Sequence, residues 1–268
     1  MADISITNED RINCSFHLKA VIISFSLLPT IFFSMNSSAL ELISHRGNCC
    51  GQIENSLLAI ESAWEVKADA VEVDVRMSKD DILLLFHDKR LNGKEISSMP
   101  FSEIHQKNNA IPTLTAILNT EAPAPSGYYI LDLKESSSEF LNVLVNTLKT
   151  NNNISKSRLA FQSSQIESLK FIKESFPESR YIFLSKLKRS SPFFTVPSAE
   201  ELNNTLIENG INHVSIKGRK FIDKNYIDLL KKSNVTVFVW TINSTNRMNH
   251  YAKMGVDGVI TDEIMKAK

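Results

Sequence analysis

Short apolar runs alternate with amphipathic helical patterns from Leu40 onward, and this alternation constrains the fold more than any other feature of the sequence. The runs typical of strands are Glu41–Ser44, Ala70–Met77, Tyr128–Leu133, Leu159–Gln162, Arg180–Leu184, His213–Ile216, Val235–Val239 and Gly258–Thr261. The stretches typical of helices are Asn55–Lys67, Thr113–Asn119, Glu139–Lys149, Gln165–Ser175, Ala199–Asn209, Asp223–Lys232 and Thr245–Met254. Eight strands alternating with helices predict an α/β fold, a (β/α)8 TIM barrel in one domain, with an open doubly wound sheet as the alternative.

An irregular stretch, Asp80–Ala110, interrupts this alternation after the second predicted strand. We expect Ile82–Phe86 to form a hairpin partner of that strand, and a polar segment to follow as far as Ile111 and Pro112. In a barrel, excursions at the C-terminal ends of strands build the rim of the active site.

The first 39 residues are predicted to be a signal peptide, followed by the barrel domain at residues 40–268. Ala20–Phe33 is strongly apolar but shorter than the about 20 residues that span a membrane. The small residues Ser37, Ser38 and Ala39 suit a signal peptidase, so we expect cleavage after Ala39 and export to the periplasm or the medium. An uncleaved N-terminal membrane anchor is the main alternative, and a buried N-terminal helix is the other.

Charge argues against a nucleic-acid partner, and cysteine usage argues against a disulfide framework. The chain has 30 basic and 30 acidic residues, so its zero net charge predicts no nucleic-acid partner. Cys49 and Cys50 are adjacent, and adjacent cysteines bridge each other only with strain. With Cys14 in the predicted signal peptide, no disulfide framework is expected, and the pair is interpreted as two small residues in a loop.

The first predicted strand ends in Ser44, His45 and Arg46. A histidine at the C-terminal end of a barrel strand points to the mouth, where barrel enzymes place their chemistry. The neighbouring Arg46 offers a planar fork of donors that suits a phosphate.

Charged residues alternate with valines in the second predicted strand. Glu72, Asp74 and Arg76 share one face, and in a barrel that face points into the interior. Two carboxylates about 5 Å apart repel by roughly 3 kcal/mol at an effective dielectric constant near 20. A bound divalent cation removes this cost, so the pair is predicted to consist of metal ligands.

Later strand ends add further polar candidates. Asp132 and Lys134 share one face of the third barrel strand, as a third carboxylate ligand and a phosphate contact. Gln162, Lys217 and Trp240 fall at or just past the ends of other strands, although the Trp240 ring can also simply plug the barrel mouth.

An ordered series of motifs resembles one known family. The motifs are His45-Arg46-Gly47, Glu54-Asn55-Ser56, Glu72-x-Asp74, His87-Asp88, Ile111-Pro112-Thr113-Leu114, Asp132-Leu133-Lys134, Trp240-Thr241-Ile242-Asn243 and Gly255-Val256-Asp257-Gly258-Val259-Ile260-Thr261-Asp262. Each is weak alone, but the set spans Leu42 to Asp262 in order and resembles the glycerophosphodiester phosphodiesterases, within the phospholipase C-like phosphodiesterase superfamily.

The resemblance implies hydrolysis of a glycerophosphodiester to glycerol 3-phosphate and an alcohol, with one divalent cation, Ca²⁺ or Mg²⁺. The implied site consists of His45 and His87 as acid and base, Arg46 as a phosphate clamp, Glu72 and Asp74 as metal ligands, and Glu54 with Asn55 in support. Asp132 is the third expected ligand, and Lys134, Gln162 and Trp240 are the further expected substrate contacts.

Two departures from the family pattern leave the substrate open. The family usually has Glu where this chain has Asp132, a shorter arm also seen in the related sphingomyelinase D toxins. The segment Leu91–Lys94 lacks the Arg-Thr-Thr run that is common there.

Three other functions stay open at this point. A lysophospholipase D or sphingomyelinase D-like enzyme would use the same site on a lipid, and only then is contact with a membrane surface expected. A metal-independent phosphatidylinositol phospholipase C would share the barrel and histidines but would not need three carboxylates. A non-catalytic barrel would bind phosphoesters without hydrolysing them.

Overall fold

The computed structural model describes residues 39–119, 126–186, 188–190, 193–195, 197–220 and 222–266, with backbone alone at 188–190 and 193–195. The predicted signal peptide, apart from Ala39, lies outside the described residues, so its cleavage and the predicted export stay predictions. Among the described residues, no helix combines the length and the apolar character that crossing a membrane would require.

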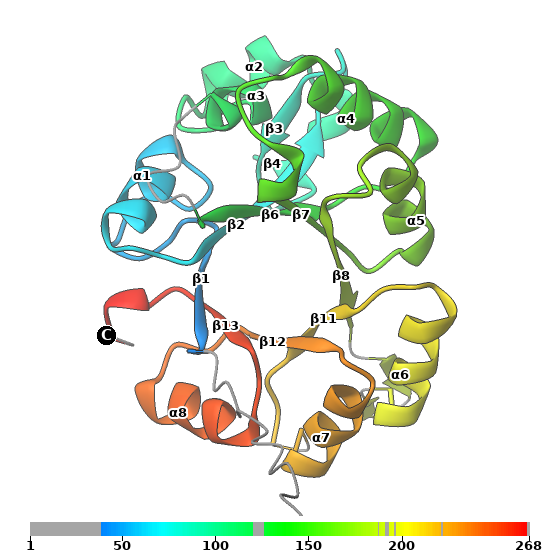
Figure 1. The fold of residues 1–268 in the computed structure, drawn as a ribbon. Helices are drawn as coiled ribbons and strands as arrows, with labels where there is room; N and C mark the ends of the chain where they lie inside the picture. Colours follow the sequence, from blue (N-terminus) through cyan, green and yellow to red (C-terminus); the bar gives the residue numbers. More distant parts are fainter. Residues whose placement is uncertain are drawn as a thin grey trace, which may run out of the picture. The chain divides into compact units, whose positions relative to one another are not determined.

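Eight parallel strands close into a barrel (Figure 1). They are β1 (Glu41–His45), β2 (Ala70–Met77), β6 (Tyr128–Leu133), β7 (Leu159–Ser163), β8 (Arg180–Ser185), β11 (His213–Lys217), β12 (Thr236–Trp240) and β13 (Gly258–Thr261). Each pairs with the next in this order, and β1 also pairs with β13, from Glu41 opposite Gly258 to Ser44 opposite Thr261. The predicted (β/α)8 barrel is therefore confirmed, and the open sheet is wrong.

Helices surround the barrel as an outer ring (Figure 1). They are α1 (Leu57–Glu65), α2 (Phe101–Lys107), α3 (Leu114–Leu118), α4 (Ser138–Thr150), α5 (Ile166–Ser175), α6 (Ala199–Glu208), α7 (Lys224–Lys232) and α8 (Thr245–Met254). Several are preceded by a residue whose side chain accepts a hydrogen bond from a backbone amide of the first turn, as Ser137 and Asp223 do. Ser198 and Glu201 form a capping box at the start of α6. Such caps contribute about 1 kcal/mol each and fix where the helices start.

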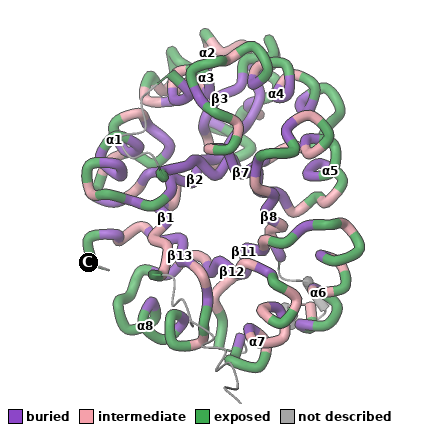
Figure 2. The backbone as a smooth tube through the Cα atoms, viewed as in Figure 1, coloured by how far each residue is buried: buried purple, intermediate pink, exposed green. Residues whose placement is uncertain are grey.

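The core has two layers, because alternate residues of each barrel strand face opposite sides. Val71, Val73 and Val75 of β2 join the large cluster between strands and helices. A smaller cluster fills the barrel interior, including Ile43, Ile130 and Phe238. The ring of strands is accordingly buried, while the outer faces of the helices are exposed (Figure 2). The same alternation leaves Glu72 and Asp74 on the interior face, above the apolar cluster.

Between β2 and β6 the predicted hairpin partner and the predicted helix are confirmed as β3 (Leu83–Leu85) and α3, but the expected polar stretch between them is folded as well. The segment contains β3, antiparallel to β2, a small hairpin of β4 (Arg90–Leu91) and β5 (Lys94–Glu95), the turn η1 (Ile96–Ser98), and α2 and α3. A third apolar cluster holds it together, comprising Leu84, Leu91, Ile96, Met99, Ile104 and Ile111. The polar stretch was wrongly predicted because these residues come from four short elements and the turns beside them, and follow no helical or strand period. A second hairpin, β9 (Lys188–Ser190) with β10 (Phe193–Thr195), was also not predicted.

Candidate active site

A cavity of about 450 Å³ opens at the C-terminal ends of the barrel strands. Nine of the residues predicted from the sequence line it, namely His45, Arg46, Glu72, Asp74, His87, Asp132, Lys134, Gln162 and Trp240. Glu54 and Asn55 contact this group from the loop after β1. Lys217, in contrast, does not line the cavity.

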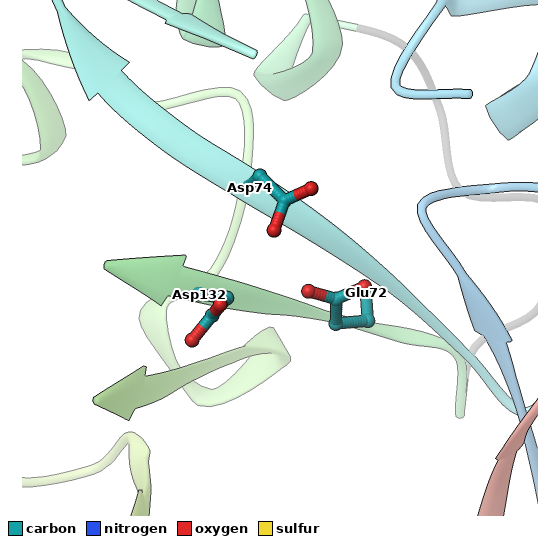
Figure 3. Close-up of side chains that lie close together, drawn as sticks. All are labelled: Glu72, Asp74 and Asp132. Atoms are coloured by element: carbon teal, nitrogen blue, oxygen red, sulfur yellow. The ribbon is translucent and has the colours of Figure 1, made fainter. Parts of the chain in front are cut away.

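Three buried carboxylates that line the cavity lie close together (Figure 3). Glu72 and Asp74 project from β2, and Asp132 projects from β6, where it is the register partner of Asp74. One oxygen of each lies within 4.8 Å of the others. Burial, reinforced by the charge of Asp74, raises the pKa of Glu72 to about 8. A buried oxygen of Asp132, Oδ1, has no hydrogen-bond partner among the described residues. Oxygen donors, close spacing and this unpartnered atom together fit a hard divalent cation.

Cationic side chains border the carboxylates. The Lys134 ammonium lies 2.7 Å from Asp74 Oδ1 and also contacts Asp132. Arg46 Nε lies 3.2 Å from Asp74 Oδ2, and Asn55 both donates to and accepts from Asp74, at 2.8 and 3.0 Å. Burial alone would raise the pKa of Asp74, but Lys134 and Arg46 outweigh it and hold that pKa below its usual value. Asp74 is therefore kept ionised.

The loop between β1 and α1 places Arg46 by means of an uncommon backbone conformation. Arg46 and Asn55 both have positive φ, at 56° and 60°, as does Gly47 at 70°. The Arg46 guanidinium donates twice to Glu54, at 2.8 and 2.9 Å, so Glu54 orients Arg46. Gly47 packs so closely on α1 that a Cβ there would lie 2.9 Å from the Ile60 nitrogen. The loop is thus fixed at both ends.

His45 is held by an acid from the far end of the chain. Its Nδ1 donates to Asp262 Oδ1 at 2.8 Å, and Asn243 donates to the other Asp262 oxygen at 2.7 Å. Burial alone would lower the pKa of His45, but the bond to Asp262 and the nearby Glu72 outweigh it and raise that pKa. With Nδ1 bonded, Nε2 is the His45 atom left for proton transfer.

His87 lies in a more open position, with 40% of its side chain exposed. Its Nδ1 donates to Asp88 Oδ1 at 2.8 Å. The Arg76 guanidinium donates to the backbone oxygen of His87 at 2.8 and 3.1 Å, which ties the His87 segment to β2. Both histidines therefore have one ring nitrogen bonded to a carboxylate and the other unassigned.

Two polar atoms on later strands lack partners. Gln162 Oε1 and Trp240 Nε1 are buried and form no hydrogen bond within the part of the chain that the structure describes. The Trp240 ring also packs on the apolar cluster inside the barrel, so it fills the mouth as well as lining the cavity. Lys217 lies 5.2 Å above that ring, which explains its position outside the cavity.

Sequence reasoning missed the second layer of this site. Asp262 was noted only as the end of a motif, and Arg76 only as one charged residue of β2. Both roles had a signal: Asp262 directly follows β13, the barrel neighbour of β1, and Arg76 continues the interior face of Glu72 and Asp74. Lys186, which also lines the cavity, had no such signal.

The arrangement can bind an anion and move protons. Arg46 and Lys134 supply positive charge beside the carboxylates, and two histidines held by carboxylates stand at the same cavity. Histidine pairs of this kind serve as general acid and base near neutral pH.

Comparison with known proteins matches residues 45–266 to the model of the glycerophosphoryl diester phosphodiesterase family. A glycerophosphodiester phosphodiesterase of Caldanaerobacter subterraneus is 24% identical over 83% of this chain and 93% of its own length. A lysophospholipase D of Mus musculus is 22% identical over 83% of this chain and 79% of its own. The solved structure of an Oleispira antarctica phosphodiesterase with the product sn-glycerol-3-phosphate is 22% identical, covers 85% of this chain and 95% of its own, and has a TM-score of 0.69.

Proposed function

The chain belongs to the glycerophosphoryl diester phosphodiesterase family, and from this premise we propose that it hydrolyses a glycerophosphodiester to glycerol 3-phosphate and an alcohol. It is a phosphoric diester hydrolase. The relative from Oleispira antarctica, whose structure holds sn-glycerol-3-phosphate, supports this product.

Glu72, Asp74 and Asp132 are proposed to hold one divalent cation, Ca²⁺ or Mg²⁺. The unpartnered Asp132 oxygen and the 4.8 Å grouping of the three carboxylates support this assignment. When bound, the cation would supply positive charge that stabilises a phosphate gaining negative charge. Asn55 and Arg46 would keep Asp74 ionised and correctly turned toward it.

Arg46 and Lys134 are proposed to bind the phosphate oxygens. Arg46 is oriented by Glu54 and presents a fork of donors that matches phosphate geometry. Gln162 and Trp240, each with an unpartnered buried polar atom, are the proposed contacts to the remaining substrate hydroxyls or oxygens.

His45 and His87 are proposed to act as general base and general acid. One neutral ring would take the proton of the nucleophile, which is either water or a neighbouring hydroxyl of the substrate. The other ring, protonated, would give its proton to the departing alcohol. Asp262 and Asp88 would keep each ring turned so that its free nitrogen serves the reaction.

One observation carries the proposal: two carboxylate-held histidines and three buried carboxylates share one cavity at the barrel mouth. The experiment is hydrolysis of a panel of glycerophosphodiesters with and without chelator. We expect turnover that chelator abolishes and added cation restores. His45→Ala and His87→Ala should each lower kcat by about two to four orders of magnitude while leaving cation binding measurable. Near-normal turnover in either variant would remove the acid–base assignment.

A lysolipid is the second candidate substrate, and an apolar groove favours it. The groove, about 500 Å³, is lined by the β1–α1 loop and by the segment around α2. Ile53 and Leu58 stand on it with 62% and 54% of their surface exposed, and the mouse relative is a lysophospholipase D. An acyl chain that leaves the mouth over this loop would cover both residues.

Assays of glycerophosphocholine beside lysophosphatidylcholine separate the two substrates. If the lysolipid is used, Ile53→Ser and Leu58→Ser should lower kcat/KM for it several-fold and leave glycerophosphocholine hydrolysis unchanged. Equal effects on both substrates would count against an acyl-binding groove.

A further inference from the structure

Two adjacent cysteines lie in the β1–α1 loop, residues 46–56, and have no part in the chemistry proposed above. Cys49 is buried in the large apolar cluster, whereas Cys50 is exposed. Their sulfur atoms are in contact, 2.7 Å apart, so both thiols point to the same side of the loop. We infer that Cys49 and Cys50 form a redox site that closes to a disulfide by exchange with a small-molecule disulfide and thereby alters the active site.

The loop connects the cysteines to the carboxylate cluster. The Asn55 amide donates to the Arg46 oxygen at 2.8 Å, so the loop closes on itself with the cysteines between its two ends. At one end the Arg46 amide donates to Glu72 at 3.0 Å, and at the other the Asn55 side chain holds Asp74. A change in the backbone at the cysteines therefore reaches two of the three carboxylates.

Geometry makes such a disulfide strained and hence reversible. The Cα atoms of adjacent residues are about 3.8 Å apart, which is less than the Cα–Cα distance of roughly 4.4–6.8 Å in relaxed disulfides. Closing the bond brings the sulfur atoms from 2.7 Å to about 2.05 Å and must twist the backbone between Cys49 and Cys50, next to the apolar cluster that contains Cys49. Strained and exposed disulfides have more oxidising potentials than structural ones, which makes them labile and suited to regulation.

The exchange proceeds in two balanced steps. The exposed Cys50 thiolate attacks one sulfur of the small disulfide, forms a mixed disulfide and expels one thiolate. Cys49 then gives its proton to solvent, attacks the Cys50 sulfur and expels the second thiolate. Two electrons pass from the cysteine pair to the small disulfide, which leaves as two thiols. Burial raises the pKa of Cys49 to about 12, which agrees with Cys50 reacting first.

The test uses the full chain with Cys14→Ser, since the sequence has three cysteines and this leaves only the pair. The protein is equilibrated with mixtures of reduced and oxidised glutathione. We expect both free thiols to disappear together, with the loss of two hydrogen masses in the peptide that contains Cys49 and Cys50. Hydrolysis of glycerophosphocholine should fall at least about threefold in the oxidised form and recover with dithiothreitol.

Cys50→Ser and Cys49→Ala serve as controls. In the reduced state their activity should equal that of the parent, and it should not change with the ratio of reduced to oxidised glutathione. Retention of both thiols at every ratio of reduced to oxidised glutathione, or accumulation of a stable mixed disulfide with glutathione, would overturn the redox site. Disulfide formation with unchanged activity would overturn its effect on the active site. The regulatory part depends on the proposed function, whereas the mass and thiol measurements do not, so the two can fail separately.

Discussion

At the scale of single residues, the His45–Asp262 pair shows how the proposed acid–base residue is held in place. Asp262 accepts from Nδ1 of the ring and is itself held by Asn243. This arrangement leaves Nε2 of His45 available for proton transfer and raises the pKa of the ring against the opposing effect of burial. Asp262 is therefore a positioning residue.

Asp262→Asn is expected to lower kcat by about one to two orders of magnitude, because the amide no longer favours the required tautomer or the protonated ring. Since Asp262 raises the pKa of His45, its loss should shift the corresponding limb of the pH–rate profile to lower pH. Steady-state kinetics across pH checks both effects. Glu263→Gln, which changes a half-buried acid next to Asp262 that pairs with Lys266, is the control and should match the parent.

Asp132→Asn is expected to abolish stabilisation by a divalent cation. A ligand present at a hundred times its dissociation constant stabilises the folded protein by about 2.7 kcal/mol, which raises Tm in the parent. The variant should keep its metal-free Tm but show no rise with Ca²⁺ or Mg²⁺. Asp228→Asn, which removes a surface carboxylate paired with Lys224, should respond like the parent. A cation-dependent rise in Asp132→Asn equal to that of the parent would contradict the assigned ligand.

The sequence predicted the residues of the cavity better than their partners. Glu72, Asp74 and Asp132 could be found because strand alternation dictates which side chains face inward. The partnership of His45 with Asp262 could not, because it joins positions 217 residues apart and depends on the register at which β1 meets β13.

At the scale of elements, the turn from β1 to α1 depends on Gly47. Its φ of +70° is costly for other residues, and a Cβ would lie 2.9 Å from the Ile60 nitrogen and 3.0 Å from the Ala59 carbonyl carbon. Backbone atoms of a helix cannot give way cheaply. The glycine therefore meets both a conformational and a steric requirement.

Gly47→Ala is expected to lower the free energy of unfolding by about 3 kcal/mol, of which the positive φ accounts for about 1 kcal/mol. Gly93→Ala separates the two causes, because Gly93 has a φ of +81° but open space around its Cβ position. Urea unfolding measures both variants. Equal losses of stability would show that the contact with α1 is not costly.

Strands and long helices followed from the sequence, whereas the short elements of the rim did not. β2, β6 and β13 have the predicted bounds, because fully buried strands stand out as apolar runs between polar turns. α2 begins after Pro100 and buries only Ile104, so its sequence shows no apolar stripe with helical spacing. Its stability comes from the apolar cluster of the β2–β6 segment, and the sequence pattern does not reveal which residues meet there.

At the scale of the whole barrel, the two ends differ in their chemistry. Ionisable residues at the C-terminal ends of the strands form the cavity, while His213 lies at the start of β11, at the opposite end. Burial, with the charge of Arg180, lowers the pKa of His213 to about 4. We therefore expect His213 to affect stability rather than catalysis.

Stability is expected to fall as this histidine becomes protonated. The unfolded chain binds the proton near pH 6.5 and the folded one only near pH 4, so the free energy of unfolding decreases between these values as pH falls. The loss between pH 7 and pH 5 should be about 1–2 kcal/mol. Chemical denaturation at both values, in the parent and in His213→Gln, checks it. The exposed His250→Gln should keep the dependence of the parent, and persistence of that dependence in His213→Gln would assign it to other groups.

The pairing of β1 with β13 has a consequence for the biosynthesis of the enzyme. The ribosome makes His45 well before Asp262, which follows 217 residues later, and the bond between them forms only after β13 has docked beside β1. A chain that stops before β13 therefore lacks the support of His45, the proposed acid–base residue, even when most of its strands have formed. Full turnover is therefore expected only once the ring of strands is complete.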